Sequence, residues 1–355
     1  MKHLLPSLTA LTLLAALFPL PADAAKPTAT VLIGKSLEDS PQTGKPKPGA
    51  LNIPFGVDFD AAGNMYIVEL TGGRVHKYDA QGKLTQIAGD GSKSYKGDGG
   101  PAADATFNGM HNVAVTPAGD VYISDSWNHC IRKIDAKTGI ISTIAGTGEA
   151  GFSGDGGPAT KATFDFIMCI TLTPANDAIY VADLKNRRIR VVDLKTGLVS
   201  TVAGNGKKGV PRDGALAVAS PLIDPRAVTV DSKGNVYVLE RGGNALRIVT
   251  PDGKIRTVVG TGKRGTALGP PLQAELGSPK HLCVDAHDNV IIADDVNHRI
   301  LKYDVKQGTV TALLGQGVEY PKRTLNHPHG VYVHTDGSLY VVDSWNHRIL
   351  RLTTE

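Results

Sequence analysis

The fold is decided by the stretch Val121-Tyr-Ile-Ser-Asp125-Ser-Trp127-Asn-His129-Cys-Ile-Arg-Lys-Ile-Asp135. An apolar strand that ends on an acid is followed by a polar turn and a second alternating strand, a pattern that predicts a β-hairpin. The same unit occurs six times, and its acids, separated by 56, 58, 57, 54 and 49 positions on subtracting successive numbers, are Glu69, Asp125, Asp183, Glu240, Asp294 and Asp343. A strand-rich, glycine-punctuated repeat of this length is typical of the blades of a β-propeller.

The composition favours a single all-β domain. The 355 residues include 41 Gly and 21 Pro, which stand at regular intervals between apolar segments and therefore predict turns and not disorder. All-β units of this length commonly form one domain. The formal net charge of +4 is too small to indicate a nucleic-acid partner, and we expect none.

The N-terminal residues differ in character from the repeats. A basic residue precedes an apolar run, residues 4–20, which two prolines interrupt and which a small-residue site at 22–24 follows. This arrangement predicts a secretory signal peptide over residues 1–24, cleaved before Ala25, and not a membrane-spanning helix. We therefore expect a mature domain of residues 25–355 in the periplasm or outside the cell, with no membrane span.

One strand near the N-terminus lacks a partner in its own repeat. Residues 30–34, Thr-Val-Leu-Ile-Gly, resemble the last strand of other repeats, such as Ser-Thr-Ile-Ala-Gly at 142–146, and the sixth repeat has no such strand before Glu355. We predict that an N-terminal strand at about residues 29–34 completes the C-terminal blade, because this closure removes an exposed sheet edge. The expected fold is a six-bladed β-propeller of four-stranded blades.

Long loops connect the predicted blades, and two of them are near-copies. They read Gly-Asp-Gly-Gly-Pro-Ala at residues 97–102 and 154–159. Asp among glycines could suggest calcium, but the several carboxylates of a calcium site are missing. No Gly-Lys-Ser/Thr follows, as a phosphate loop requires. We interpret both loops as packing elements.

The three cysteines, Cys130, Cys169 and Cys283, lie in or beside apolar strands. Their odd number leaves at least one thiol free. We interpret them as small buried side chains. A disulfide is compatible with an oxidising compartment but is not required.

The turn that follows the acid carries a family signature. It reads Asn-His at residues 128–129, 297–298 and 346–347. The pattern resembles the NHL-repeat family over almost all of residues 30–355, and the Gly-Asp-Gly-Gly-Pro-Ala loops are similar to those of its secreted bacterial members. The resemblance implies a six-bladed propeller. It does not select a function, because the family includes ligand-binding sensor domains, RNA-binding regulators and a zinc-dependent amidating lyase, and related folds include lactonases.

The acid that ends each unit has two interpretations. Six carboxylates could form a ring that binds a cation. A feature present in every repeat is more simply explained by folding, with each acid bonding turn N–H groups and the basic residues of the next strand. We favour the structural interpretation.

Positions that differ between repeats are better candidates for a binding site. The innermost strand of a blade starts at the entrance of the central channel, where loops on a rigid scaffold commonly hold ligands. Two successive positions at its start are occupied, in blade order, by Phe55, His111, Met168, Arg226, Lys280 and His329, and then by Gly56, Asn112, Cys169, Ala227, His281 and Gly330. Phe and Met occupy the first position in blades 1 and 3, so the fold does not require a polar residue there. The polar residues are therefore the predicted ligand-binding set. The alternative is an ordinary solvated channel.

Blades 2 and 6, which flank blade 1, share further residues. His111 and His329 occupy equivalent positions, and the same blades carry Trp127 and Trp345 in an identical Asp-Ser-Trp-Asn-His turn. Trp beside polar groups suits a flat sugar or a cation. The alternative is that both indoles only pack their turns.

The Pro-His-Gly segment around His329 is similar to the zinc-ligand motif of the amidating-lyase family, which implies His ligands on alternating blades. His111 and His329 match, but the third place holds Arg226, which does not ligate a metal, and a catalytic zinc has three protein ligands. Our first hypothesis is that this set, with Lys280, binds a small anionic or glycan-like ligand without catalysis. The alternative is a metal-dependent lyase or lactonase that holds zinc or calcium at His111 and His329.

Overall fold

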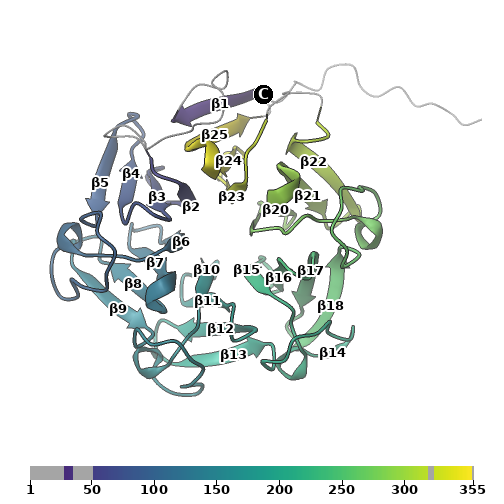
Figure 1. Cartoon of the computed structure of the whole chain (residues 1–355), viewed down its shortest axis with the longest axis horizontal. Helices are drawn as coiled ribbons and strands as arrows, with labels where there is room; N and C mark the ends of the chain where they lie inside the picture. The colour runs from purple at the N-terminus through teal and green to yellow at the C-terminus, as the bar shows by residue number, and fades with distance from the viewer. Residues whose placement is uncertain (1–27, 35–50, 319–323, 354–355) are drawn as a thin grey trace, which may run out of the picture.

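The computed structural model describes residues 28–34, 51–318 and 324–353. These residues form six antiparallel sheets arranged in a ring around a common axis (Figure 1). The six-bladed β-propeller predicted from the sequence is therefore confirmed. The expected signal peptide, residues 1–24, lies outside the described residues. Among those that are described, no helix has the length and apolar character needed to cross a membrane.

In each blade the first strand is innermost, and the innermost strands of neighbouring blades contact one another around the ring. The strands of blades 1 to 3 are β2 (Pro54–Phe59), β3 (Met65–Glu69), β4 (Val75–Tyr78), β5 (Leu84–Ala88), β6 (Met110–Val115), β7 (Val121–Asp125), β8 (Cys130–Ile134), β9 (Ile141–Ala145), β10 (Ile167–Leu172), β11 (Ala178–Asp183), β12 (Arg188–Asp193) and β13 (Val199–Ala203). The strands of blades 4 to 6 are β15 (Pro225–Val230), β16 (Val236–Glu240), β17 (Ala245–Val249), β18 (Lys254–Val259), β19 (His281–Val284), β20 (Val290–Asp294), β21 (Arg299–Asp304), β22 (Thr309–Gly315), β23 (Pro328–Val333), β24 (Leu339–Asp343) and β25 (Arg348–Thr353).

The N-terminal strand closes the ring. Strand β1 (Thr28–Ile33) pairs antiparallel with β25 and forms the outer edge of blade 6, as expected. Both ends of the described chain therefore share one sheet (Figure 1). Blade 4 has a fifth strand that the sequence analysis did not predict, because β14 (Ala215–Leu216) pairs with β18. The remaining elements are short 3-10 helices, η1 (Ala102–Asp104), η2 (Ser126–Asn128), η3 (Ala159–Lys161), η4 (Ala217–Ala219), η5 (Pro271–Gln273), η6 (Asp295–Asn297) and η7 (Ser344–Asn346).

The repeated acid holds each blade to the loop that precedes it. The Asp125 carboxylate, which is fully buried, accepts hydrogen bonds from the Asn108 backbone N–H at 2.7 Å and from Asn128 Nδ2 at 2.8 Å, and Arg132 lies 3.5 Å away. The backbone donor comes from the crossing loop, whereas we expected it from the turn. The other acids are also fully buried, and their loop donors are Asn52, Asp165, Ile223, Gly277 and Asn326. These contacts support the structural interpretation.

Each near-copy loop packs on the blade that follows it in the chain. Arg132 donates to Asp98 at 2.7 Å, and Arg190 donates to Asp155 at 2.8 Å. Both guanidinium groups are buried, so these bonds clamp the loop aspartates onto the third strand of each blade. Each of these aspartates therefore already has a cationic partner, in line with a packing role.

The Asn-His turn links neighbouring blades, a role that the sequence did not reveal. His129, in the left-handed conformation with φ of 52°, accepts a hydrogen bond on Nδ1 from the N–H of Phe166 in the next blade at 3.2 Å. His347 accepts in the same way from Ile53, which joins blade 6 to blade 1 at 3.1 Å. The glycine that ends the last strand is needed beside this turn, because a Cβ on Gly146 would clash with the His129 carbonyl.

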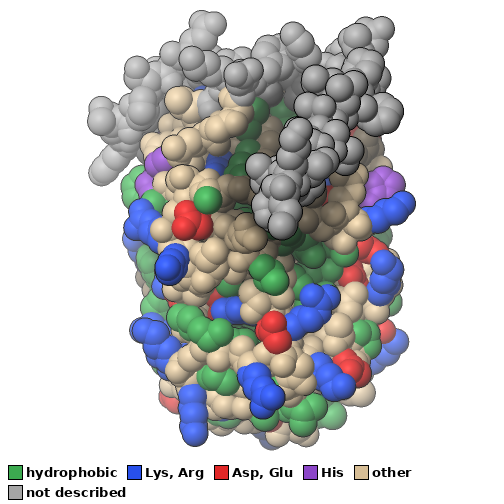
Figure 2. Space-filling view, turned by 90° about the vertical axis from the view of Figure 1, so that its right-hand side faces the viewer, with side chains coloured by type: hydrophobic (Ala, Val, Ile, Leu, Met, Phe, Trp, Pro, Cys, Tyr) green, Lys and Arg blue, Asp and Glu red, His purple; other side chains and the backbone are tan. Residues whose placement is uncertain are grey.

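The apolar core lies between the blades. One cluster, for example, combines Val68 and Val75 of blade 1 with Val113 and Ile123 of blade 2. Burying each such side chain contributes about 1.5–3 kcal/mol, so the stack of blades is the main source of stability. All three cysteines are free; Cys130 and Cys169 are buried residues, and Cys283 is half-buried. On the side of the ring in Figure 2, Lys and Arg side chains are interspersed with fewer Asp and Glu side chains.

Candidate functional site

A β-bulge decides which side chains point to the axis. In five innermost strands the register with the second strand slips by one residue at the same place, and the extra residues are Phe55, His111, Met168, Arg226 and His329. Lys280 precedes β19 at the equivalent place in blade 5, and its N–H donates to the Ala293 carbonyl at 3.0 Å. A bulge re-aims a side chain. We call these six residues the mouth tier.

The mouth tier converges on Phe55. Its ring stacks on the His329 imidazole with centroids 3.9 Å apart and meets the His111 imidazole edge-on at 4.9 Å. Arg226 comes from blade 4, opposite blade 1, and its Cζ lies 6.0 Å from the centre of the same ring. The structure therefore brings together His111, Arg226 and His329, which are more than two hundred positions apart at the extremes.

Positive charge exceeds negative charge within this cluster. Arg226 is 3% exposed, donates one hydrogen bond, from Nη1 to the Met168 carbonyl at 3.2 Å, and leaves its Nε without a partner. Lys280 Nζ lies 3.7 Å from Asp295, the carboxylate that contacts it. Burial and the nearby Arg226 lower the pKa of Lys280 to about 8, and burial lowers the pKa of Arg226 to about 10. Both groups therefore carry their charge at neutral pH with little compensation.

The two imidazoles are neutral. Burial, together with the charges of Arg226 and Lys280, holds the pKa of both His111 and His329 well below the usual value. His111 Nδ1 donates to the Gly109 carbonyl at 2.8 Å, which leaves Nε2 as an acceptor. His329 Nε2 lies 3.7 Å from Asp295, and its Nδ1 is buried without a partner.

This donor set does not match a metal centre. The Phe55 ring packs against both imidazoles, and the third place of the expected triad holds the cationic Arg226. Within the described ranges, no three His, Cys, Asp or Glu side chains form a group that could hold a metal ion. The residues present therefore do not fit a zinc or calcium site at His111 and His329.

Of the other predicted site residues, Trp127 adjoins the mouth tier, whereas Asn112, His281 and Trp345 lie apart from it. Asn112 and His281 are one position further along their strands, where Asn112 Nδ2 and His281 Nε2 are 2.9 Å apart. Trp127 packs beside His111 with ring centroids 6.3 Å apart. Trp345 is 49% exposed and contacts His327 instead of the mouth tier.

Two residues at the site were missed by the sequence analysis. Phe55 was interpreted as a position that only satisfies the fold, yet its ring is the contact point of the cluster. Asp295 was not considered, although it contacts Lys280, His327 and His329. A signal existed, because the residue after the blade acid is Ser in blades 2 and 6 and Asp in blade 5.

Comparisons with known proteins confirm the family resemblance. Residues 107–134 and 325–352 match the NHL repeat model. The chain is 26% identical over 348 residues to NHL repeat-containing protein 2 of Gallus gallus. That alignment covers 87% of this chain and 47% of the relative, so the chain spans about half the length of the curated protein.

Solved structures share the fold at low identity. An auxiliary nutrient binding protein from Bacteroides thetaiotaomicron superposes with a TM-score of 0.67 and 14% identity, over 93% of this chain and 77% of its own. Virginiamycin B lyase from Staphylococcus aureus gives a TM-score of 0.53 and 14% identity, over 92% of this chain and 99% of its own. At this identity, the likeness shows the propeller fold alone.

Proposed function

We propose that this protein, an NHL-repeat propeller, binds a small anionic ligand at the mouth tier without catalysing a reaction on it. The ligand is a carboxylate, or a glycan-like molecule that carries a carboxylate. One observation carries the proposal: Arg226 and Lys280 are held together in a largely buried cluster that Asp295 neutralises only in part. Burying a cation without full pairing is costly, so an incoming anion gains the pairing that the free protein lacks.

The geometry supplies hydrogen-bond partners as well as charge. Arg226 Nε has no partner within the described residues, and Arg is suited to bidentate recognition of carboxylates. His111 Nε2 is free to accept from a ligand hydroxyl, since Nδ1 is bonded to Gly109. The aromatic Trp127 stands beside this imidazole and suits the flat face of a sugar. Together these groups favour an acidic sugar or hydroxy acid over a simple inorganic anion.

The predicted signal peptide agrees with this function. A mature domain of residues 25–355 in the periplasm or outside the cell would encounter nutrients and glycan fragments. The fold neighbour named as a nutrient binding protein supports a binding role, although its likeness to this chain extends to the fold only.

Calorimetric titration tests the proposal. Purified residues 25–355 are titrated with galacturonate, citrate and phosphate, and with neutral galactose as the control ligand. Arg226→Met and Lys280→Met remove the charges, and Met is tolerated sterically because Met168 occupies the equivalent place in blade 3. The matched control is Lys137→Met, which removes the same charge from an exposed turn.

We expect the anion to bind 10- to 100-fold more weakly to either mouth variant, since a charge-assisted bond is worth about 1.5–3 kcal/mol. Lys137→Met should bind like the wild type, and galactose should bind far more weakly than galacturonate. Unchanged galacturonate affinity in a folded Arg226→Met variant would overturn the proposal.

The alternative of a metal-dependent lyase or lactonase has less support. One fold neighbour is a lyase, but the fold alone carries no activity. A bound metal would need a third ligand where Arg226 stands. Elemental analysis of the purified protein decides the matter: one equivalent of zinc or calcium that is lost in His111→Ala would favour the alternative.

A further inference from the structure

Side chains that face the axis form three tiers. The bulge directs two successive residues inward, and the alternation of the strand adds a third two positions later. The middle tier contains Asn112, Cys169 and His281, which line an axial cavity of about 270 Å³. The third tier, all of which lines the same cavity, is Asp58, Ala114, Thr171, Thr229, Cys283 and Tyr332.

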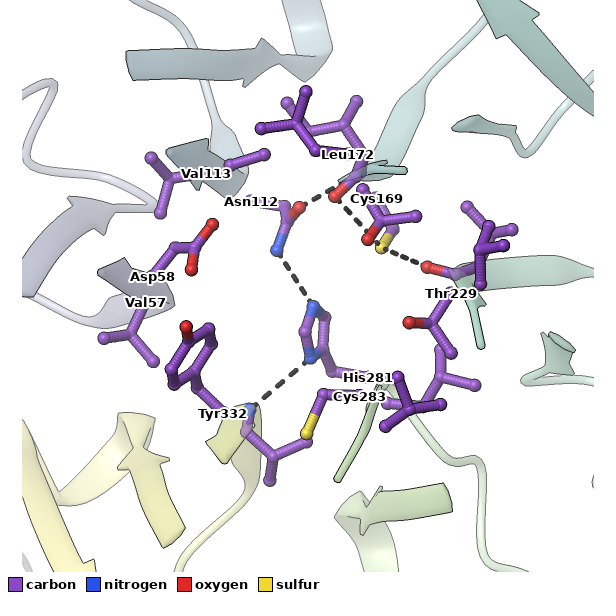
Figure 3. A pocket seen from close by; sticks show the side chains of 18 of the residues that line it. Val57, Asp58, Asn112, Val113, Cys169, Leu172, Thr229, His281, Cys283 and Tyr332 are labelled. Carbon is purple, nitrogen blue, oxygen red and sulfur yellow. Dashed lines mark hydrogen bonds between the residues drawn. The ribbon is translucent and has the colours of Figure 1, made fainter. Parts of the chain in front are cut away.

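A hydrogen-bonded bridge separates this cavity from the mouth tier. Asn112 and His281 come from blades 2 and 5, which face each other across the ring, and they meet 2.9 Å apart at the axis (Figure 3). The Asn112 amide is fixed, because its Oδ1 accepts from the Ile170 N–H at 3.0 Å. The cavity extends away from the bridge to the exposed Pro174 in the turn between β10 and β11. It therefore reaches solvent at the opposite end of the innermost strands from Arg226 and Lys280.

The cavity has the opposite charge from the mouth tier. Asp58 is the acid in its lining, and no Lys or Arg is among the described residues that line it. His281 adds no positive charge, since burial and Arg226 lower its pKa to about 3. The rest of the wall is apolar or uncharged, with the strand residues Val57, Val228 and Leu282.

Asp58 is held in place with room for a further partner. The Val115 N–H of blade 2 donates to Oδ2 at 2.7 Å, and the Phe59 N–H donates to Oδ1 at 2.8 Å. A carboxylate oxygen can accept more than one hydrogen bond, so both remain able to bind a donor. The Tyr332 side chain lies next to this carboxyl at the cavity wall, and a hydrogen bond from its hydroxyl opposes the rise in the pKa of Asp58 that burial causes (Figure 3). An ammonium group donates hydrogen bonds to a carboxylate and is attracted to the face of an aromatic ring.

We propose that this cavity is a second binding site, independent of the mouth tier, and that it binds a small organic cation, a protonated amine. The ammonium group pairs with Asp58 and contacts Tyr332. The short alkyl chain of the amine lies against the valine and leucine side chains of the wall. A water molecule occupies about 30 Å³ of the liquid, so a cavity of about 270 Å³ has room for a small organic molecule. The protein thus presents an anion site at one end of its axis and a cation site at the other.

The pH dependence of this site is set by Asp58. Burial raises its pKa to about 7, against the hydrogen bonds that lower it. The titratable groups that face it from neighbouring strands are Tyr332 and Cys283, whose pKa values burial raises, and His281. None of these three titrates between pH 6 and 8. Cation binding requires the carboxylate and should therefore be about tenfold weaker at pH 6 than at pH 8.

Calorimetric titration of residues 25–355 with butylammonium, butanol and butyrate tests the proposal. At pH 8 we expect butylammonium to bind with at least tenfold higher affinity than butanol or butyrate at this site. Asp58→Asn should weaken butylammonium binding at least tenfold, whereas Arg226→Met, which disables the mouth tier, should leave it unchanged. Galacturonate binding should show the reverse pattern, so failure of one site is distinguishable from failure of the other.

A second measurement does not depend on the variant. Asp58→Asn places an amide against two backbone donors, and if it fails to fold, the wild-type data decide. Butylammonium binding at pH 7 should release about half a proton in weakly buffered solution, because pairing drives the Asp58 carboxyl to ionise. The proposal is wrong if wild-type protein binds butanol as tightly as butylammonium, if no cation binds at millimolar concentration, or if affinity is the same at pH 6 and pH 8.

Discussion

Replacing His281 by Gln should make the protein less sensitive to acid. Both ring nitrogens of His281 face N–H groups, Nε2 towards Asn112 Nδ2 at 2.9 Å and Nδ1 towards the Val331 N–H at 3.4 Å. The neutral ring carries one proton and accepts on its other nitrogen, so the second proton of an imidazolium would place a further N–H against a donor. Burial and Arg226 accordingly lower the pKa of His281 to about 3, from a usual value of 6.5.

The sign and size of the effect follow from linkage. The unfolded chain takes up a proton on His281 near pH 6.5, and the folded protein does so only near pH 3. The stability that the neutral imidazole contributes is therefore fully present above pH 6.5 and is lost as the pH falls towards 3. Between pH 7.5 and pH 5, the loss amounts to about 2 kcal/mol. Gln keeps an amide donor and acceptor at the bridge and does not titrate.

Chemical denaturation at pH 7.5, 6 and 5 measures the effect. The wild type should lose about 2 kcal/mol more of its unfolding free energy over this range than His281→Gln, since His111 and His329 titrate in both proteins and cancel. The matched control is His287→Gln, which changes an exposed imidazole and should follow the wild type. If wild type and His281→Gln lose the same stability, His281 takes up its proton in the folded state, and the bridge does not shield the axis.

Three further predictions test the scaffold and the mouth tier. Asp294→Ala should lower the unfolding free energy measured in urea by about 3–5 kcal/mol, because it leaves the buried Arg299, which lies 2.7 Å from Asp294, without its carboxylate. Asp294→Glu should lower it less, since Glu240 fills the equivalent place in blade 4. Equal losses in the two variants would contradict this account. Gly146→Ala should lower the melting temperature more than Gly156→Ala. Both glycines have positive φ (93° and 81°), but only a Cβ at Gly146 would meet backbone and side-chain atoms. A larger loss at Gly156 would refute the clash. Galacturonate affinity should fall as the pH rises through about 8, where Lys280 loses its charge, and this fall should be absent in Lys280→Met; a flat profile in the wild type would contradict the role of Lys280.

The sequence predicted where the mouth tier lies and its polar residues, but it did not predict the role of Phe55. Subtracting the repeat identified the position where His111, Arg226, Lys280 and His329 stand. It also discarded Phe55, because a phenyl ring looked like a structural choice. Whether a ring at one position of blade 1 contacts imidazoles of blades 2 and 6 depends on how the bulge aims each side chain, and periodicity carries no information on that.

Partners between distant repeats were likewise not predictable. Asn112 and His281 were assigned to the same site as Arg226, yet they bond to each other 169 positions apart and separate that site from a second cavity. No sequence motif marked Asp58 as a site residue. Its properties arise only because β6 donates Val115 N–H to it and burial raises its pKa.

The amino-acid sequence by itself determined the number of blades, the order of their strands and the closure of the ring by an N-terminal strand, because these follow from a repeated local pattern of apolar residues, turns and acids and from the one strand that the sixth repeat lacks. Only the tertiary structure decided which side chains meet on the axis, which charges are left without a partner and where the channel divides. Those properties exist only once six blades have closed on one another, since each contact joins residues from different blades across a space that no single repeat encloses.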